Sequence, residues 1–380
     1  MKKSQGIFTL LVLIFGWSIC KNYENRSYDW DLPGYVGSVL AAEFPGNFDK
    51  VHQLTFQSIK QEAPESEFTN IIKGNNARKS YYENAQSFSE QLPYYQVKVL
   101  FVAAIDFFYK LGFSLPKSVL ITNLLSGFLA GIFVFLILGH IFPQRVWLVF
   151  SLSLFIFLLP LFSDLAIAPN PDMFGFMVLL AFFYAYLKKY PLLLRFLLLV
   201  CLVLIRTDYL LFGLSYLFFE LLVNYSKSKK VDFKIIGYSL ILFAMYFSLI
   251  KFYHYPGWKD LFYDSFISRR NFISKQNPDF TWRDYINVAF GNLLNMKKVI
   301  LSSSILMIAS LYLGKKKEEK LFAILLFVNI YMKFFLFPAA GQFRFFFPFI
   351  IFQLFWMFIL MQRNLNNKFL KTVFGQLLWS

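Results

Sequence analysis

Metal-binding and disulfide-forming residues are scarce in this chain of 380 residues. It has three histidines, His52, His140 and His254, and two cysteines, Cys20 and Cys201. The histidines are scattered, the cysteines form no CxxC pair, and there is no HExxH motif. These absences argue against a zinc site and provide no disulfide framework.

Charged residues are also few, at 16% of the chain, whereas 57% of the residues are hydrophobic. Soluble domains seldom exceed half apolar by so much. The apolar residues form long blocks, and a membrane-spanning helix needs ~20 mostly apolar residues. The ~10-residue alternating segments of a transmembrane β-barrel are absent. We therefore expect an all-α polytopic membrane protein.

Nucleotide-binding motifs are a third absence. No P-loop, protein-kinase or Rossmann glycine pattern occurs, because the strings "GFLAGIF" and "FPGNF" lack the required spacing. The sequence gives no support to an ATP-driven function, and no internal repeat is evident.

The apolar blocks predict about ten transmembrane helices. The first is an uncleaved signal anchor, since a basic start precedes an apolar run without an A-x-A-like cleavage site. The other spans are expected near 117–138, 146–162, 173–187, 191–205, 208–223, 233–252, 298–313, 321–337 and 345–361. The segment 93–113 carries three charges, so it is expected to be an interfacial amphipathic helix.

These spans divide the chain, taken as a single integral membrane domain (1–380), into six parts. The expected parts are a signal-anchor helix (1–23), a first external loop with interfacial helices (24–116), core spans (117–252), a second external loop (253–297), the last three spans (298–361) and a cytoplasmic tail (362–380).

The distribution of lysine and arginine predicts the orientation. Every predicted loop on the side of the amino terminus contains Lys or Arg, whereas most acids lie in the long loops on the other side. By the positive-inside rule both termini are cytoplasmic. The net charge of +16 then needs no nucleic-acid partner. Long loops are usually functional, so we expect the working face to be the outer one.

Two acids stand directly after the first span, in "YDWD". Asp29 and Asp31 share one face if this segment is extended. They could supply a general base, with a slight preference for Asp29, or hold a divalent metal in the manner of a DxD motif. Otherwise they begin a solvated loop, or Asp31 caps the next helix.

Further candidates lie at the ends of later spans. Asp172 follows two prolines in "APNPD" and serves either as a second acid of the site or as a partner of a helix dipole. Arg206 stands between apolar blocks, where a cation is costly unless it pairs or faces a cavity. It is expected to bind a phosphate, to pair with Asp208 or to reach the interface. Arg344 and Lys333 are expected to face the same lipid-open cavity.

Two weaker assignments complete the set. Lys98 is a further candidate for substrate binding. Arg269 and Arg270, in "DSFISRRNFISK", are expected on a surface helix that contacts anionic headgroups.

The order of these features resembles the membrane glycosyltransferases of the GT-C fold. A signal anchor is followed by an acid in "YDWD", by the segment that begins "PYYQVKV", by "APNPD", by a span that ends in "VLIRTD" and by "QFRFFFP". The likeness covers nearly the whole chain. It departs from larger members in lacking a soluble carboxy-terminal domain.

The resemblance implies transfer of a sugar from a polyprenyl-phosphate donor to the hydroxyl of a glycan, lipid or protein acceptor. Asp29, Asp31 or Asp172 would supply the base, while Arg206, Arg344, Lys333 and Lys98 would bind the donor phosphate. No cofactor is expected beyond the possible divalent metal at Asp29 and Asp31. We expect nearby arginines to lower the pKa of the base more than a lipid environment raises it.

The implied location is the cell (inner) membrane with the site facing outside or the periplasm. Three alternatives stay open at this point: an envelope polysaccharide polymerase, a transporter or lipid flippase, and a catalytically inactive scaffold with the same fold.

Overall fold

The structure, a computed structural model, describes residues 2–339 and 342–365. Within these residues all regular structure is helical, which confirms the expected all-α class. The helices are α1 (Lys2–Glu24), α2 (Asp31–Glu43), α3 (Phe48–Lys60), α4 (Glu65–Lys73), α5 (Asn76–Glu83), α6 (Ala85–Ser89), α7 (Pro93–Gln96), α8 (Val99–Lys110), α9 (Leu115–Ile141), α10 (Val146–Phe157), α11 (Pro160–Ile167), α12 (Asp172–Leu187), α13 (Leu192–Ile205), α14 (Tyr209–Ser228), α15 (Phe233–Phe252), α16 (Trp258–Phe266), α17 (Trp282–Asn295), α18 (Lys297–Leu313), α19 (Lys317–Leu336), the 3-10 helix η1 (Phe343–Phe345) and α20 (Phe347–Leu365).

Five of the described helices are long and apolar enough to cross a membrane, namely α1, α9, α14, α15 and α20. The count rises to seven if two bent pairs each form one span, α10 with α11 (55°) and α17 with α18 (73°). Five to seven of the expected ten spans are thus supported. Helices α12 and α13 have only 16 and 14 residues.

The span expected near 146–162 is broken between α10 and α11. Pro160 is the first residue of α11, and proline disfavours helical backbone in the residue before it. Leu159 accordingly has a non-helical backbone, with ψ of 131°.

The membrane helices share one large apolar core, in which aromatic rings pack closely. The rings of Phe15 and Phe157 stack with centroids 4.0 Å apart. Gly131 of α9 lies against both, and a Cβ atom there would fall 2.8 Å from Phe15. The glycine therefore allows α1 and α10 to approach α9.

The segment expected as the first external loop folds into helices α2–α8, which pack around a second apolar core. We call this group of helices the cap. Tyr35 is fully buried in it and makes edge contacts with the rings of Tyr95 and Phe101. The single interfacial helix expected over 93–113 is wrong, because the chain breaks between α7 and α8. This break puts Lys98 immediately before the first residue of α8.

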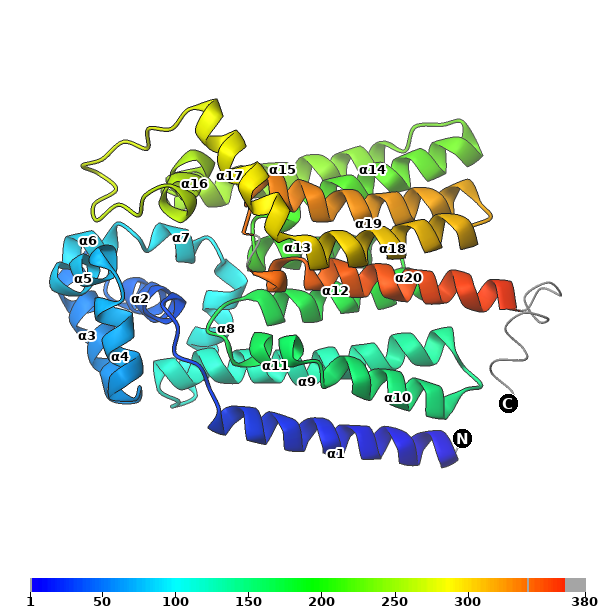
Figure 1. Cartoon of the computed structure of the whole chain (residues 1–380), viewed down its shortest axis with the longest axis horizontal. Helices are drawn as coiled ribbons and strands as arrows, with labels where there is room; N and C mark the ends of the chain where they lie inside the picture. The colour runs from blue at the N-terminus through cyan, green and yellow to red at the C-terminus, as the bar shows by residue number, and fades with distance from the viewer. Residues whose placement is uncertain (1, 340–341, 366–380) are drawn as a thin grey trace.

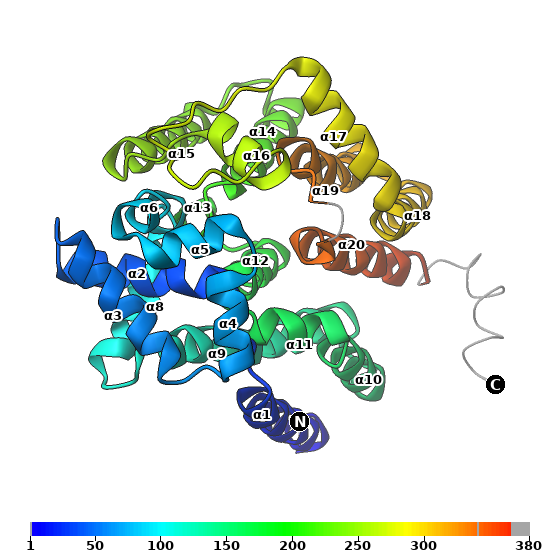
Figure 2. The same ribbon diagram turned by 60° about the vertical axis from the view of Figure 1, so that its left-hand side comes forward.

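The cap occupies one end of the helix bundle. Figure 1 shows α2–α7 and α16 at that end, while the amino terminus and the α9–α10, α14–α15 and α18–α19 connections lie at the other. In Figure 2, with the cap turned forward, α5 and α6 lie beside α16. The connections that carry lysine and arginine therefore lie at the same end of the bundle as the amino terminus. Which end faces the cytoplasm stays a prediction.

The segment after α16 is attached to the cap by hydrogen bonds. The Tyr81 hydroxyl donates to the Arg270 carbonyl over 2.5 Å, and the Ser274 hydroxyl donates to Glu90 over 2.6 Å. The expectation that Arg270 lies on a surface helix is wrong. It lies in a loop, is 2% exposed, and pairs with Asp260 and Asp264 over 2.8 Å each.

The other arginine of this pair, Arg269, donates to the side chain of Gln91 over 3.0 Å and so helps to attach the same loop. Of the expected cytoplasmic tail, 362–365 belongs to α20, and 366–380 lies outside the described residues.

Candidate functional site

Seven charged side chains from six segments meet where the cap joins the bundle. Most stand at helix ends: Asp31 and Asp172 are the first residues of α2 and α12, and Arg206 and Asp208 lie between α13 and α14. Helix ends carry free backbone groups and interrupt the apolar surface, so polar side chains gather there. The members of this charge cluster are Asp31, Lys98, Asp172, Arg206, Asp208, Lys333 and Arg344.

Arg206 is held by two carboxylates. Its Nε and Nη2 donate to the two oxygens of Asp208 over 3.0 and 3.2 Å. Its Nη1 also donates to Asp172. The expected alternative of a pair with Asp208 is therefore present, and the second acid gives Arg206 a fixed position.

Arg344 reaches the same acid from the other side. Its Nε lies 3.5 Å from Asp172 Oδ2, and its Nη2 lies 4.0 Å from Asp31 Oδ2. Arg206 and Arg344 therefore meet at one carboxylate, and their expected role in phosphate binding stays a prediction. Arg344 also donates to Gln342, which orients its guanidinium group.

The two lysines of the cluster differ in their partners. Lys333 Nζ lies 3.0 Å from Asp208 Oδ2. Lys98 Nζ donates to the Tyr35 hydroxyl over 2.8 Å and lies over the rings of Tyr35 and Tyr95. Among the described residues, Lys98 has no carboxylate within 4.0 Å. Burial lowers the pKa of Lys98 to about 8, although Asp31 acts in the opposite direction.

The acids of "YDWD" separate in the structure. Asp31 accepts a hydrogen bond from the Tyr95 hydroxyl over 3.3 Å and faces Arg344. Asp29 instead accepts from the backbone N–H of Trp30 over 2.6 Å, and no cation within the described ranges pairs with it. Only Asp31 joins the charge cluster, whereas the sequence slightly favoured Asp29.

Our expectation for the pKa of the base is wrong for Asp31. Burial raises the pKa of its carboxyl, and the nearby Lys98 and Arg344 offset this only in part. The geometry agrees with this, because Arg344 stands 4.0 Å away and the Tyr95 ring packs closely against Gly34 in the first turn of α2. The closest Arg344 contact goes to Asp172 instead.

The sequence analysis did not identify Tyr35 and Tyr95 as residues of the site, and it considered Asp208 only as an ion-pair partner of Arg206. Tyr35 is four residues after Asp31, a spacing that places two side chains on one helix face. Asp208 follows Arg206 in a three-residue break between apolar blocks, which is a detectable sign of a buried ion pair.

The donor set does not suit the divalent metal considered for Asp29 and Asp31. Within residues 2–339 and 342–365, no three His, Cys, Asp or Glu side chains are close enough to hold a metal ion. The cluster has three carboxylates and four cations, and each carboxylate lies within 4.0 Å of an arginine or lysine. This excess of cations suits an anion.

The lipid-open cavity expected at the arginines stays a prediction. The small cavity beside Asp208 and Lys333 measures about 10 Å³, which is enough for about one water molecule.

Comparison with known proteins gives no relative: no protein-family model, no curated protein and no solved structure matches this chain.

Proposed function

We propose that this protein is a GT-C-like glycosyltransferase that uses a polyprenyl-phosphate sugar at the surface of a membrane. The observation that supports this best is the charge cluster, in which four cations and the acid Asp31 meet between the cap and the bundle. A transferase of this kind needs a base beside a phosphate-binding group, and the cluster offers both.

The cationic side of the cluster is suited to a phosphate. Lys98 is the cation without a carboxylate partner among the described residues, so an anionic ligand would be its natural counter-ion. Arg344, whose contacts with carboxylates are the longest at 3.5 and 4.0 Å, can turn to the same ligand at little cost. Arg206 is fixed by Asp172 and Asp208, and its part is to position Asp172.

Asp31 is the proposed general base. Its carboxylate takes the proton of the acceptor hydroxyl as the acceptor oxygen bonds to the anomeric carbon of the sugar. The bond from that carbon to the phosphate oxygen breaks, and its electron pair leaves with the polyprenyl phosphate. Lys98 and Arg344 stabilise the charge that gathers on the departing phosphate. The attack inverts the anomeric configuration, and the raised pKa of Asp31 makes it a stronger base than an ordinary aspartate.

A transporter is the second candidate, since two helix pairs are bent by 55° and 73° as in proteins with broken spans. Transporter sites, however, lie near the middle of the bilayer. Here Asp31 of the charge cluster is the first residue of α2, which belongs to the cap at one end of the bundle (Figure 1). That position favours a site at the membrane surface.

For the cellular setting we propose the inner membrane, with both termini cytoplasmic and the cap outside. Basic connections at the end opposite the cap support this orientation through the positive-inside rule.

The test is transfer of radiolabelled sugar by the purified protein from a panel of polyprenyl-phosphate donors. We expect incorporation with at least one donor and its loss in the Asp31→Asn variant. Binding of the lipid phosphate without transfer from any donor, together with its movement across vesicles, would instead support the transporter.

A further inference from the structure

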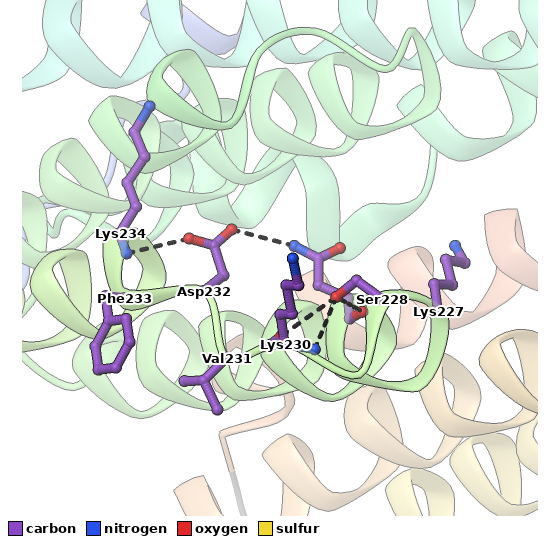
Figure 3. A pocket seen from close by; sticks show the side chains of 8 residues that line it. Lys227, Ser228, Lys230, Val231, Asp232, Phe233 and Lys234 are labelled. Atoms are coloured by element: carbon purple, nitrogen blue, oxygen red, sulfur yellow. Dashed lines mark hydrogen bonds between the residues drawn. The ribbon is translucent and has the colours of Figure 1, made fainter.

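A second charged site lies at the end of the bundle opposite the cap. The sequence "NYSKSKKVDFK" covers the end of α14, the following turn and the start of α15, and it borders an open depression of about 620 Å³. Figure 3 shows its lysines spread along the turn, with Asp232 between Lys230 and Lys234. We call it the lysine pocket, and its lining residues are Asn224, Lys227, Ser228, Lys230, Val231, Asp232, Phe233 and Lys234.

The backbone of this turn is held by its own side chains. The Ser228 hydroxyl donates to the Asn224 carbonyl over 2.9 Å and accepts from the Lys230 N–H over 3.2 Å. Asp232 accepts from the N–H of Lys234 over 3.1 Å and so caps α15. The lysine pocket is therefore formed before any ligand binds, which lowers the entropic cost of binding.

The pocket has more positive charge than its own acid can balance. Among the described residues, Lys230 and Lys234 have no ion pair, while Lys227 pairs with Glu318 over 3.1 Å. The Asp232 carboxylate is directed to a backbone N–H and to the Asn224 amide, not to an ammonium group. The charges of Lys230 and of Lys234, whose ammonium group lies over the Tyr238 ring, are thus not balanced by an acid.

The surroundings of the lysine pocket indicate that this anion belongs to a lipid. Both helices that end here are candidate spans, and only 17% of the apolar window of α15 is buried in the protein. Phe233 is 77% exposed and, in Figure 3, extends to the opposite side of the turn from the ammonium groups of Lys230 and Lys234. Exposed aromatic and basic side chains at a span end are typical of the headgroup region.

From these observations we propose that the lysine pocket binds the phosphate headgroup of an anionic phospholipid. The phosphodiester would contact Lys230 and Lys234, while the acyl chains would lie along the exposed apolar face of α15. The site is separate from the charge cluster and does not depend on the proposed transferase activity.

The test is native mass spectrometry of the purified chain titrated with phosphatidylglycerol or with phosphatidylcholine. We expect phosphatidylglycerol to bind more tightly, and the Lys230→Gln/Lys234→Gln variant to bind it about tenfold more weakly or worse. The Lys230→Arg/Lys234→Arg variant keeps both charges and should keep the binding, which separates loss of the site from loss of the fold.

A matched control is Lys315→Gln/Lys317→Gln, which removes the same charge from the α18–α19 connection at the same end of the bundle. Equal weakening in the control would show a general attraction to anionic lipid and overturn the proposed pocket. Displacement of phosphatidylglycerol by millimolar inorganic phosphate would overturn the lipid assignment, because a lipid site also depends on the acyl chains.

Discussion

Replacing Asp31 by asparagine tests the proposed base with little change to the fold. Asparagine keeps the size of the side chain and an acceptor for the Tyr95 hydroxyl, which lies 3.3 Å from Oδ1. The lost attractions are to Arg344 Nη2 at 4.0 Å and, at longer range, to Lys98, and removal of the charge also removes the cost of its burial. We expect a loss of about 1 kcal/mol of stability at most.

The effect on transfer should be far larger. Loss of a general base typically lowers a rate by ~10²–10⁴-fold, or about 3–5 kcal/mol of activation free energy. The assay is the initial rate of sugar transfer from a polyprenyl-phosphate donor at saturating donor. Donor binding should change little, because Lys98 and Arg344 remain.

Asp29 provides the matched control, two residues away and with the same change of charge. Its carboxylate contacts only the N–H of its neighbour Trp30 among the interactions described, so Asp29→Asn should keep the rate within about threefold. The reverse pattern, with Asp29→Asn inactive and Asp31→Asn active, would refute the assignment. If both variants transfer at the normal rate, the base lies elsewhere, and Asp172 is next in order.

Four further outcomes are expected. The donor KM should rise as the pH passes through about 8, where the Lys98 ammonium loses its proton, and Lys98→Arg should remove this rise; a flat KM from pH 7 to 9 would contradict the phosphate role. Arg344→Ala should reduce kcat/KM by about 10²-fold and Arg344→Lys should restore it only partly, so full activity of the alanine variant would exclude a phosphate contact. Arg270→Ala should lower the free energy of unfolding by about 3–5 kcal/mol in a thermal or denaturant assay, because it leaves the buried Asp264 and the partly buried Asp260 without their cation; an unchanged midpoint would contradict this. A cysteine placed at Ser274 should react with an impermeant thiol reagent outside the cell and one at Ser228 should not, and labelling of residue 228 would reverse the proposed orientation.

The sequence allowed much of the charge cluster to be predicted because charged residues are costly beside apolar spans. Arg206 had to pair or face a cavity, and the structure gives it Asp208 and Asp172. The resemblance to the GT-C glycosyltransferases, which rests on the order of the motifs, then assigned Asp31 and Arg344 to the same site. This reasoning depends on charge and position, both of which a single sequence displays.

The number and shape of the helices were less predictable. Apolar composition identifies a block such as 146–162 but does not show where its backbone turns, and the break at Leu159 depends on Pro160. Arg270 was misassigned for a related reason. Its acids, Asp260 and Asp264, are near in sequence, but only the folded loop turns them toward its guanidinium group.

Individual contacts between distant segments could not be predicted. The hydrogen bond from Lys98 to Tyr35 depends on how α2 packs against the break before α8, and neither segment has a pattern that specifies the other. The same applies to Tyr95 and Asp31, which are 64 residues apart.

The attachment of the cap to the loop after α16 has a consequence for biosynthesis. Tyr81 and its partner Arg270 are 189 residues apart in the chain. At the usual ~5–20 residues per second, a ribosome needs about 10–40 s to make the intervening segment. During that interval the Tyr81 hydroxyl has no Arg270 carbonyl to bind, and the Glu90 carboxylate lacks Ser274. The nascent cap therefore lacks these attachments until most of the membrane helices have been synthesised.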